Sequence, residues 1–164
     1  KLVEDFKHHD KVTKTYYAIV RGKLKNQSWT IDKKLKRIEN AKNENKVQVS
    51  NDGQTAITNY KVIGEHKIQT SKWAEYISEL EVQILTWRMH QIRVHLASLW
   101  HPIVWDNTYW DKAFNSYIKT QFGLDRQALH AWKIEFFHYN KNKKMNLEAK
   151  LKDDLIEFLE KIKG

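Results

Sequence analysis

The segment over residues 86–110, TWRMHQIRVHLASLWHPIVWDNTYW, gathers the residue types that could carry chemistry in this chain. It holds two arginines, three histidines and four tryptophans. Four apolar side chains recur in it at spacings of three, four and three, namely Met89, Ile92, Leu96 and Leu99. This period predicts a helix with one apolar stripe, and it places Arg88 and Arg93 on opposite edges of that stripe. Arginines in this position can hold a phosphate or pair with a carboxylate.

Three uses of this predicted helix stay open. At 100° per residue Arg93 lies near His90, and Arg88 lies near His95. The helix could be an ordinary basic amphipathic helix, a metal site, or part of an RNA-handling active site. A metal site is disfavoured because His90 and His95 are five residues apart, on different faces, and the chain contains no H-E-x-x-H pattern. We therefore expect no metal ion.

The charge of the chain favours a polyanionic partner. Its net charge is +9 and its pI is about 9.5, which favours nucleic acid ahead of a membrane surface. No apolar run reaches the roughly 18 residues that a membrane-spanning helix needs, so no membrane partner is expected. The chain has no cysteine, which fits a reducing compartment, and we expect a cytoplasmic protein.

A sheet must position the predicted helix by packing against its apolar stripe. Residues that are β-branched, aromatic or alternating predict strands over 12–20, 47–50, 54–63, 76–86 and 128–137. Asn51-Asp52-Gly53 is the turn that would join the second and third of these as a hairpin. The polar and basic residues 23–46 indicate loops with short strands, and residues 141–144 indicate a solvated turn.

The C-terminal residues 151–164 predict a second helix. Its apolar face is formed by Leu151, Leu155, Phe158, Leu159 and Ile162. Two aspartates lie near its start and two lysines near its end, as the helix dipole favours. The elements together predict an α+β fold with a mixed, mostly antiparallel sheet and flanking helices.

Segment 86–110 resembles a motif of the RluA-type pseudouridine synthases, T-G-R-x-H-Q-I-R-x-H-L followed by G-H-P-I-x-G-D and Y-G. Four other segments are similar to further motifs of that family. KTYYAIVRG resembles K-x-Y-x-A-x-V-x-G, SWTIDKKLKR resembles a G-x-I-D segment ending in Arg, GQTAITNYKVI resembles G-x-x-A-x-T-x-Y, and RQALHAWKIEF resembles R-x-x-L-H-A. Five matches in the same order over most of the chain make the resemblance specific.

The resemblance implies a pseudouridine-synthase fold and an enzyme that isomerises uridine within structured RNA, either rRNA or tRNA. Such enzymes detach uracil from the ribose, rotate it and rejoin it through C5, with no metal or organic cofactor. Residues 1–164 would form a single partial catalytic domain, its C-terminal portion, and we expect a monomer with RNA as its partner. A non-catalytic RNA-binding domain that keeps the fold is the alternative.

The resemblance also assigns candidate site residues. Tyr16 matches a tyrosine that packs on the base, and Arg93 matches the arginine that pairs with the family's catalytic aspartate. Arg88 is a second candidate for pairing with the catalytic aspartate, or for binding phosphate. Residues expected to line the pocket or meet RNA are Arg88, His90, Gln91, Leu129 and His130. His90, His95 and His130 are expected to organise hydrogen bonds rather than to carry protons.

The catalytic aspartate itself has no match. In the family it lies in an H-R-L-D-x-x-T-S-G segment upstream of the K-x-Y strand, and only residues 1–13 precede that strand here. Asp10 and Asp125 lack the flanking residues of this segment. We therefore expect the nucleophile to be absent, as in a fragment that begins after it, and the chain to be inactive by itself.

Five tryptophans stand where the family pattern has glycine, at Trp29, Trp87, Trp100, Trp105 and Trp110. Glycine allows a positive φ and close backbone approach, and an indole allows neither. Restoring them would double the glycine count of 5, bringing it near the roughly 7% usual in proteins. One hypothesis is a UGA codon that the source organism reads as glycine. The alternative is real tryptophans in a decayed or altered protein, and UGG at these five codons would exclude recoding.

Overall fold

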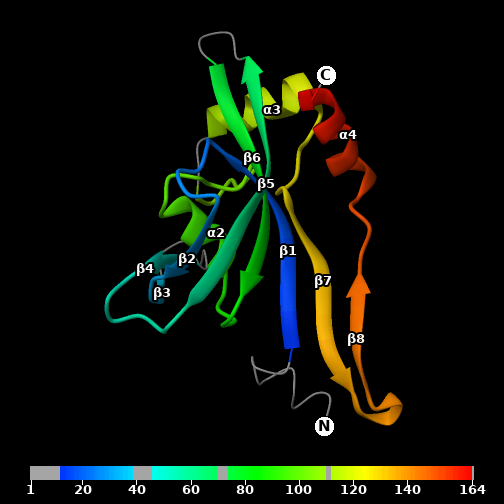
Figure 1. The fold of residues 1–164 in the computed structure, drawn as a ribbon. Coiled ribbons are helices and arrows are strands. Elements are labelled where there is room, and N and C mark those ends of the chain that lie inside the picture. Colours follow the sequence, from blue (N-terminus) through cyan, green and yellow to red (C-terminus); the bar gives the residue numbers. More distant parts are fainter. Residues whose placement is uncertain (1–11, 39–45, 70–73, 110–111, 164) are drawn as a thin grey trace.

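A six-stranded antiparallel sheet forms the centre of the molecule in a computed structural model, which describes residues 12–38, 46–69, 74–109 and 112–163 (Figure 1). The strand order is β2-β5-β6-β1-β7-β8, and each pair of neighbours is antiparallel. The strands are β2 (Ser28–Asp32), β5 (Ile57–Gln69), β6 (Ala74–Ile84), β1 (Val12–Arg21), β7 (Leu129–His138) and β8 (Lys143–Glu148). The predicted α+β class with a mostly antiparallel sheet is confirmed.

Strand register defines the face of the sheet on which the candidate site lies. Tyr16 of β1 is opposite Val82 of β6, and Ile84 of β6 is opposite Thr58 of β5. Side chains of opposed residues share a face, and alternate residues along a strand do the same. We call this side the Tyr16 face. Ala18 and Val82 are fully buried on it, so the apolar core begins directly beside Tyr16.

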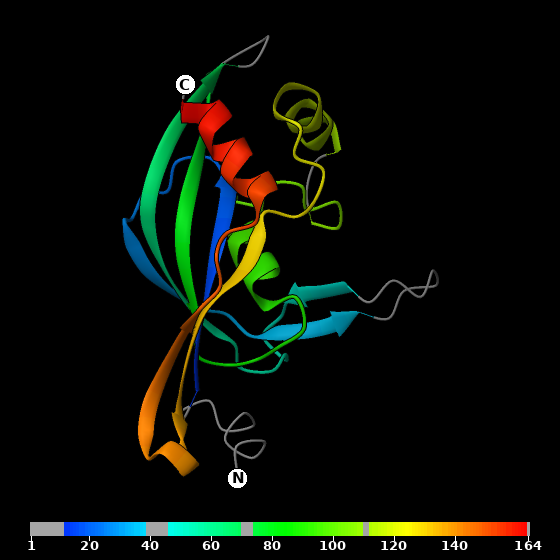
Figure 2. The ribbon, with the colours of Figure 1, turned by 90° about the vertical axis from the view of Figure 1, so that its right-hand side faces the viewer.

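Three helices among the described residues pack around this sheet. They are α2 (Gln91–Ala97), α3 (Lys112–Phe122) and α4 (Asp153–Lys163), and none of the described helices is long and apolar enough to cross a membrane. Helix α2 and the small sheet of β3 (Leu35–Ile38) and β4 (Lys46–Val49) lie on the same side of the large sheet (Figure 2). The predicted C-terminal helix is confirmed as α4, which buries four of its five expected apolar side chains.

The hairpin predicted over residues 47–63 is wrong. The chain does turn at 51–53, where the Gly53 amide donates to the Ser50 carbonyl at 3.0 Å. Beyond the turn, Gln54 bridges to Leu35, and β4 pairs with β3 while β5 pairs with β2 and β6. A Cβ at Gly53 would lie 2.6 Å from the Leu35 carbonyl oxygen, so glycine permits this close approach.

The helices and short strands differ in detail from the predictions. Helix α2 is shorter than its stripe indicated, since Met89 precedes it and Leu99 follows it. Helix α3 was not predicted, although Phe114 and Ile118 are buried one turn apart. The expected short strands within 23–46 are confirmed as β2 and β3. The solvated turn at 141–144 is only partly confirmed, because β8 already begins at Lys143.

A chain of buried hydrogen bonds fixes α2 on the Tyr16 face. Gln91 Nε2 donates to Thr58 Oγ1 at 3.0 Å, and Thr58 Oγ1 lies 2.9 Å from His95 Nδ1. His95 Nε2 lies 2.9 Å from the Lys33 carbonyl oxygen, which can only accept, so this nitrogen carries the proton. His95 is completely buried, and burial lowers the pKa of His95 below its ordinary value of 6.5. The imidazole is therefore held neutral.

Two of the anomalous tryptophans adopt the left-handed backbone conformation. Trp100 has φ 66° and Trp105 has φ 63°. At the end of α2 the Trp100 amide donates to Ala97 and the His101 amide to Leu96, which is a Schellman motif with Trp100 at the position that usually holds glycine. Trp105 is the third residue of a turn closed by the Asp106 amide and the Ile103 carbonyl, where a positive φ again selects glycine.

Trp29 and Trp87 give no such signal. Trp29 is extended in β2, where it lies opposite Tyr60 and is 56% exposed. Trp87 is half-exposed and is not among the described residues of positive φ. Trp110 lies outside the described residues. The backbone conformation therefore favours glycine at positions 100 and 105. At positions 29 and 87 it does not distinguish glycine from tryptophan.

We expect Trp100→Gly to raise the free energy of unfolding by about 0.5–1 kcal/mol. Trp105→Gly should raise it less, because the Trp105 side chain packs against the apolar core and its removal loses buried area. A left-handed conformation costs a non-glycine residue roughly 1–2 kcal/mol, which exceeds the entropy cost of glycine. The matched control is Trp29→Gly, which should be neutral or destabilising because glycine weakens a strand. Urea unfolding of the three variants measures this, and stabilisation by Trp29→Gly alone would contradict it.

We expect the stability of the fold to fall on mild acidification because of His95. Its pKa is lowered in the native state, so the unfolded chain binds the proton more readily, and this contribution is complete above about pH 6.5 and lost as pH falls below it. One such group gives at most about 1.4 kcal/mol per pH unit. His95→Gln should unfold with a shallower pH dependence than the original chain between pH 7.5 and 5.5. Equal slopes would mean that His95 is not held neutral.

Candidate active site

A buried ion pair organises the residues around the N-terminus of α2. Arg93 Nε donates to Asp106 Oδ2 and Arg93 Nη2 to Asp106 Oδ1, both at 2.8 Å. Asp106 is completely buried, and its Oδ1 also accepts from the amides of Thr108 and Tyr109 at 3.0 and 3.2 Å. A buried carboxylate is tolerated when it is paired and hydrogen-bonded in this way. The pair holds the guanidinium in one orientation.

Asp106 was not among the residues predicted for the site. Only Asp10 and Asp125 were candidates for the missing carboxylate, although Asp106 is the aspartate of the H-P-I-x-x-D match. That match was the signal that could have found it. Nothing in the linear spacing of Arg93 and Asp106 indicates an ion pair, because they belong to different elements.

His90 lies beside this pair at the start of α2. It is the N-cap residue and has φ 56°, a left-handed conformation. Its Nδ1 lies 2.9 Å from the hydroxyl of Tyr109, and the two rings meet edge to face at 5.7 Å. Burial, with the positive charge of Arg93 as a further cause, lowers the pKa of His90. His90 is therefore neutral at physiological pH.

A pocket of about 250 Å³ brings most of the predicted site residues together. It lies between β1, β7 and the start of α2. Its lining comprises Tyr16, Ile84, Trp87, Arg88, His90, Gln91, Ile92, Arg93, Gln127 and Leu129. We call it the arginine pocket. Of the seven predicted site residues, only His130 is missing from this lining.

Tyr16 reaches the arginine pocket from an irregular point of the sheet. Thr15 pairs with Lys133 and Tyr16 with Ala131, so Trp132 of β7 is the extra residue of a β-bulge. Bulges redirect side chains and are frequent beside active sites. Burial raises the pKa of Tyr16, so its hydroxyl keeps its proton.

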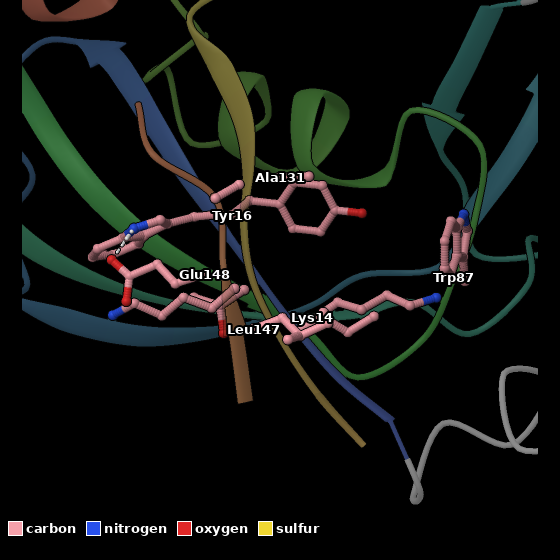
Figure 3. Close-up of a pocket in the computed structure, with 11 residues that line it drawn as sticks. Lys14, Tyr16, Trp87, Ala131, Leu147 and Glu148 are labelled. Carbon is pink, nitrogen blue, oxygen red and sulfur yellow. Dashed lines mark hydrogen bonds between the residues drawn. The ribbon is translucent and has the colours of Figure 1, made fainter. Parts of the chain in front are cut away.

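A second pocket of about 350 Å³ shares Tyr16 with the arginine pocket. Figure 3 shows it, with the Tyr16 ring and the Lys14 side chain both extending toward Trp87. Lys14 Nζ lies 3.1 Å from the centre of the Trp87 ring, within cation–π distance. Tyr16 and Trp87 line both pockets, so position 87 forms part of the boundary between them.

Arg88 and His130 do not lie where the sequence predicted. Arg88 precedes α2 and donates from Nε to the Thr55 carbonyl at 3.1 Å, so the helical spacing that would place it near His95 does not apply to it. His130 is opposite Tyr17, on the face of the sheet away from Tyr16, and its Nε2 is 3.3 Å from the Ala149 carbonyl. The remaining predicted residue, Gln91, lines the pocket with every polar atom of its amide already hydrogen-bonded inside the protein.

No carboxylate lines the arginine pocket among the residues that the structure describes. Asp106 is completely buried and paired with Arg93. The Asp125 side chain is 60% exposed and pairs with Lys119 at 3.3 Å. Asp10 lies outside the described residues. Within the same part of the chain, no cluster of three or more His, Cys, Asp or Glu side chains could hold a metal ion.

Comparison with known proteins identifies the family of this chain. The sequence model of the RNA pseudouridylate synthase family matches residues 1–98. Ribosomal large subunit pseudouridine synthase C of Vibrio cholerae is 34% identical over 154 residues, which are 93% of this chain and 44% of that protein. Ribosomal large subunit pseudouridine synthase D of Escherichia coli is 28% identical over 166 residues, 98% of this chain and 47% of that protein.

A solved structure supports the fold. The human protein RNA Pseudouridylate Synthase Domain Containing 1 superimposes with a TM-score of 0.74 at 23% identity, over 91% of this chain and 58% of that one. The chain spans less than half the length of the two bacterial relatives. Because the family model covers more than half of its residues, the chain belongs to the RNA pseudouridylate synthase family.

Proposed function

We propose that this chain forms the uridine-binding part of an enzyme that isomerises uridine to pseudouridine in structured RNA. The observation that carries the proposal is the arginine pocket, which brings Tyr16, Arg93 and Leu129 together from three separate sequence matches. The two bacterial relatives are named for the large ribosomal subunit, which makes rRNA the first substrate class to test, ahead of tRNA.

The size and lining of the pocket suit a single base. Its volume of about 250 Å³ is slightly below the roughly 300–1,000 Å³ of sites for drug-sized ligands. A uridine in structured RNA must leave its stack to enter any enclosed site, at a cost of a few kcal/mol. Stacking on an aromatic ring recovers about 1–3 kcal/mol per base, and Tyr16 offers that ring. Leu129 supplies an apolar wall beside it.

Arg93 is the arginine that we assign to the chemistry. Asp106 occupies its Nε and Nη2, while Nη1 has no hydrogen-bond partner among the described residues. A guanidinium held in this way can present Nη1 to a second acceptor, which we propose is the family's catalytic aspartate. Arg88 is half-buried in the lining of the same pocket, and we propose that its guanidinium meets a phosphate.

The aspartate must come from outside the described residues, since no carboxylate among them lines the pocket. We propose that an H-R-L-D segment of the same gene product supplies it. The test is to incubate a large-subunit rRNA transcript with this chain and with the complete product of its gene, and to count pseudouridine by mass spectrometry. We expect pseudouridine only from the complete product. Pseudouridine made by residues 1–164 would show that the nucleophile lies within them.

The RNA would also contact the small sheet of β3 and β4, which stands out from the large one (Figure 2). Its strands carry Lys36, Arg37 and Lys46, and lysine and arginine side chains neutralise phosphates. The chain's net charge of +9 supports the same partner. Affinity for structured RNA should therefore fall as salt rises.

We expect Tyr16→Phe and Arg93→Ala to fail for different reasons in the complete gene product. Phenylalanine keeps the stacking ring, so RNA affinity should stay within about twofold, while loss of a proton-transfer group should slow turnover by about 10²–10⁴. Arg93→Ala leaves Asp106 buried without its partner, at a cost of about 3–5 kcal/mol. It should lose turnover and stability together. RNA affinity, single-turnover rate and urea unfolding separate the two.

The matched control is Arg21→Ala, which removes an arginine paired with Glu75 at 2.7 Å and absent from the lining of the arginine pocket, so turnover should stay unchanged. A normal rate in Arg93→Ala with an inactive Arg88→Ala would assign the role to the other arginine. Activity in both arginine variants would contradict the assignment of this pocket.

A further inference from the structure

We propose that Tyr109 is a positioning residue that holds His90 as the tautomer whose Nε2–H donates to an oxygen of the bound nucleotide, and that links this histidine to the β3–β4 sheet. The proposal rests on the function proposed above, because it takes the arginine pocket as the nucleotide site. Tyr109 was not among the residues predicted from the sequence, and it lies outside the pocket lining.

Hydrogen-bond geometry carries the first step. The Tyr109 hydroxyl lies 2.9 Å from the Val47 amide, which can only donate, so the phenolic oxygen accepts there. The same hydroxyl lies 2.9 Å from His90 Nδ1. Burial raises the pKa of Tyr109, so the phenol keeps its single proton. Of its contacts with described residues, only His90 Nδ1 can take that proton.

The tautomer of His90 follows from this arrangement. A neutral imidazole has one protonated and one unprotonated nitrogen. If Nδ1 accepts from Tyr109, Nε2 must carry the hydrogen. No partner for Nε2 occurs among the described residues, and His90 lines the arginine pocket. An Nε2–H in that position can donate to a uracil carbonyl or to a phosphate oxygen, and it cannot accept from a donor.

The ring of Tyr109 holds the rest of the arrangement in place. Arg93 Cζ lies 4.9 Å from its centre, and the ring packs against a small core that includes Leu35 and Val47 of the β3–β4 sheet. Tyr109 follows Asp106 closely in the chain, and its own amide donates to the Asp106 carboxylate at 3.2 Å. One side chain therefore touches the paired arginine, the pocket histidine and a backbone amide of β4.

The experiment compares the original chain with Tyr109→Phe, which keeps the ring and removes the hydroxyl. Imidazole ¹⁵N shifts at pH 7.5, assigned with a His90→Gln variant, give the His90 tautomer, and hydrogen exchange gives the protection of the Val47 amide. We expect the Nε2–H tautomer in the original chain, a mixture of tautomers in Tyr109→Phe, and at least tenfold faster exchange at Val47. Neither readout needs RNA or turnover, so failure of the proposed function would leave them unaffected.

The matched control is Tyr117→Phe, which removes a hydroxyl bonded to the Gln69 carbonyl at 2.8 Å and should change neither readout. Uridine and ribose 5-phosphate, added separately to the original chain, distinguish the two oxygen sources by which of them shifts His90 Nε2. If neither uridine nor ribose 5-phosphate shifts the His90 Nε2 resonance, the donor role is overturned. A proton on Nδ1 in the original chain, or an unchanged tautomer in Tyr109→Phe, would overturn the positioning role.

Discussion

The ion pair between Arg93 and Asp106 is the constraint on which the candidate site depends. Asp106 is completely buried, and it meets Arg93 through both oxygens while also accepting from two backbone amides. A pair of this kind adds little net stability, because desolvation offsets most of the attraction, but breaking it is costly. Its main effect is therefore geometric. It ties the turn after Val104 to α2 and leaves the guanidinium one fixed direction in which to meet a ligand.

Helix α2 is held on its other side by uncharged groups. Gln91 and His95 both bond to Thr58 of β5, so the short helix is fixed to the sheet without relying on its own length. The arginine pocket lies between this helix and the bulge that presents Tyr16. Tertiary hydrogen bonds thus position the helix on one side of the pocket, and the β-bulge positions Tyr16 on the other, which fixes the candidate residues relative to one another.

Short sequence patterns predicted those strands and helices whose formation depends on neighbouring residues in the chain. The strand at β1 was predicted from its β-branched and aromatic residues and the helix at α4 from its apolar period, and both were placed well. The hairpin after the Asn51–Gly53 turn failed because Gln54 pairs with Leu35, far back in the sequence, and a turn signal does not name the partner strand. For the site, Tyr16 and Arg93 came from motif resemblance, and the structure brings both to one pocket. The H-P-I-x-x-D match contains Asp106, but it does not show which residue Asp106 pairs with. The bonds from Asp106 to Arg93 and from Tyr109 to His90 join separate elements, so only the folded arrangement shows them.

The most direct test of this account is the single-turnover rate of Asp106→Asn in the complete gene product. Asparagine keeps the shape of the side chain and removes the charge that orients Arg93. If the pair sets the geometry of a uridine site, pseudouridine formation should slow by at least about 100-fold, since small displacements of catalytic groups have effects of this size. A rate equal to that of the original enzyme would show that the pocket works without the ion pair, and it would contradict the account.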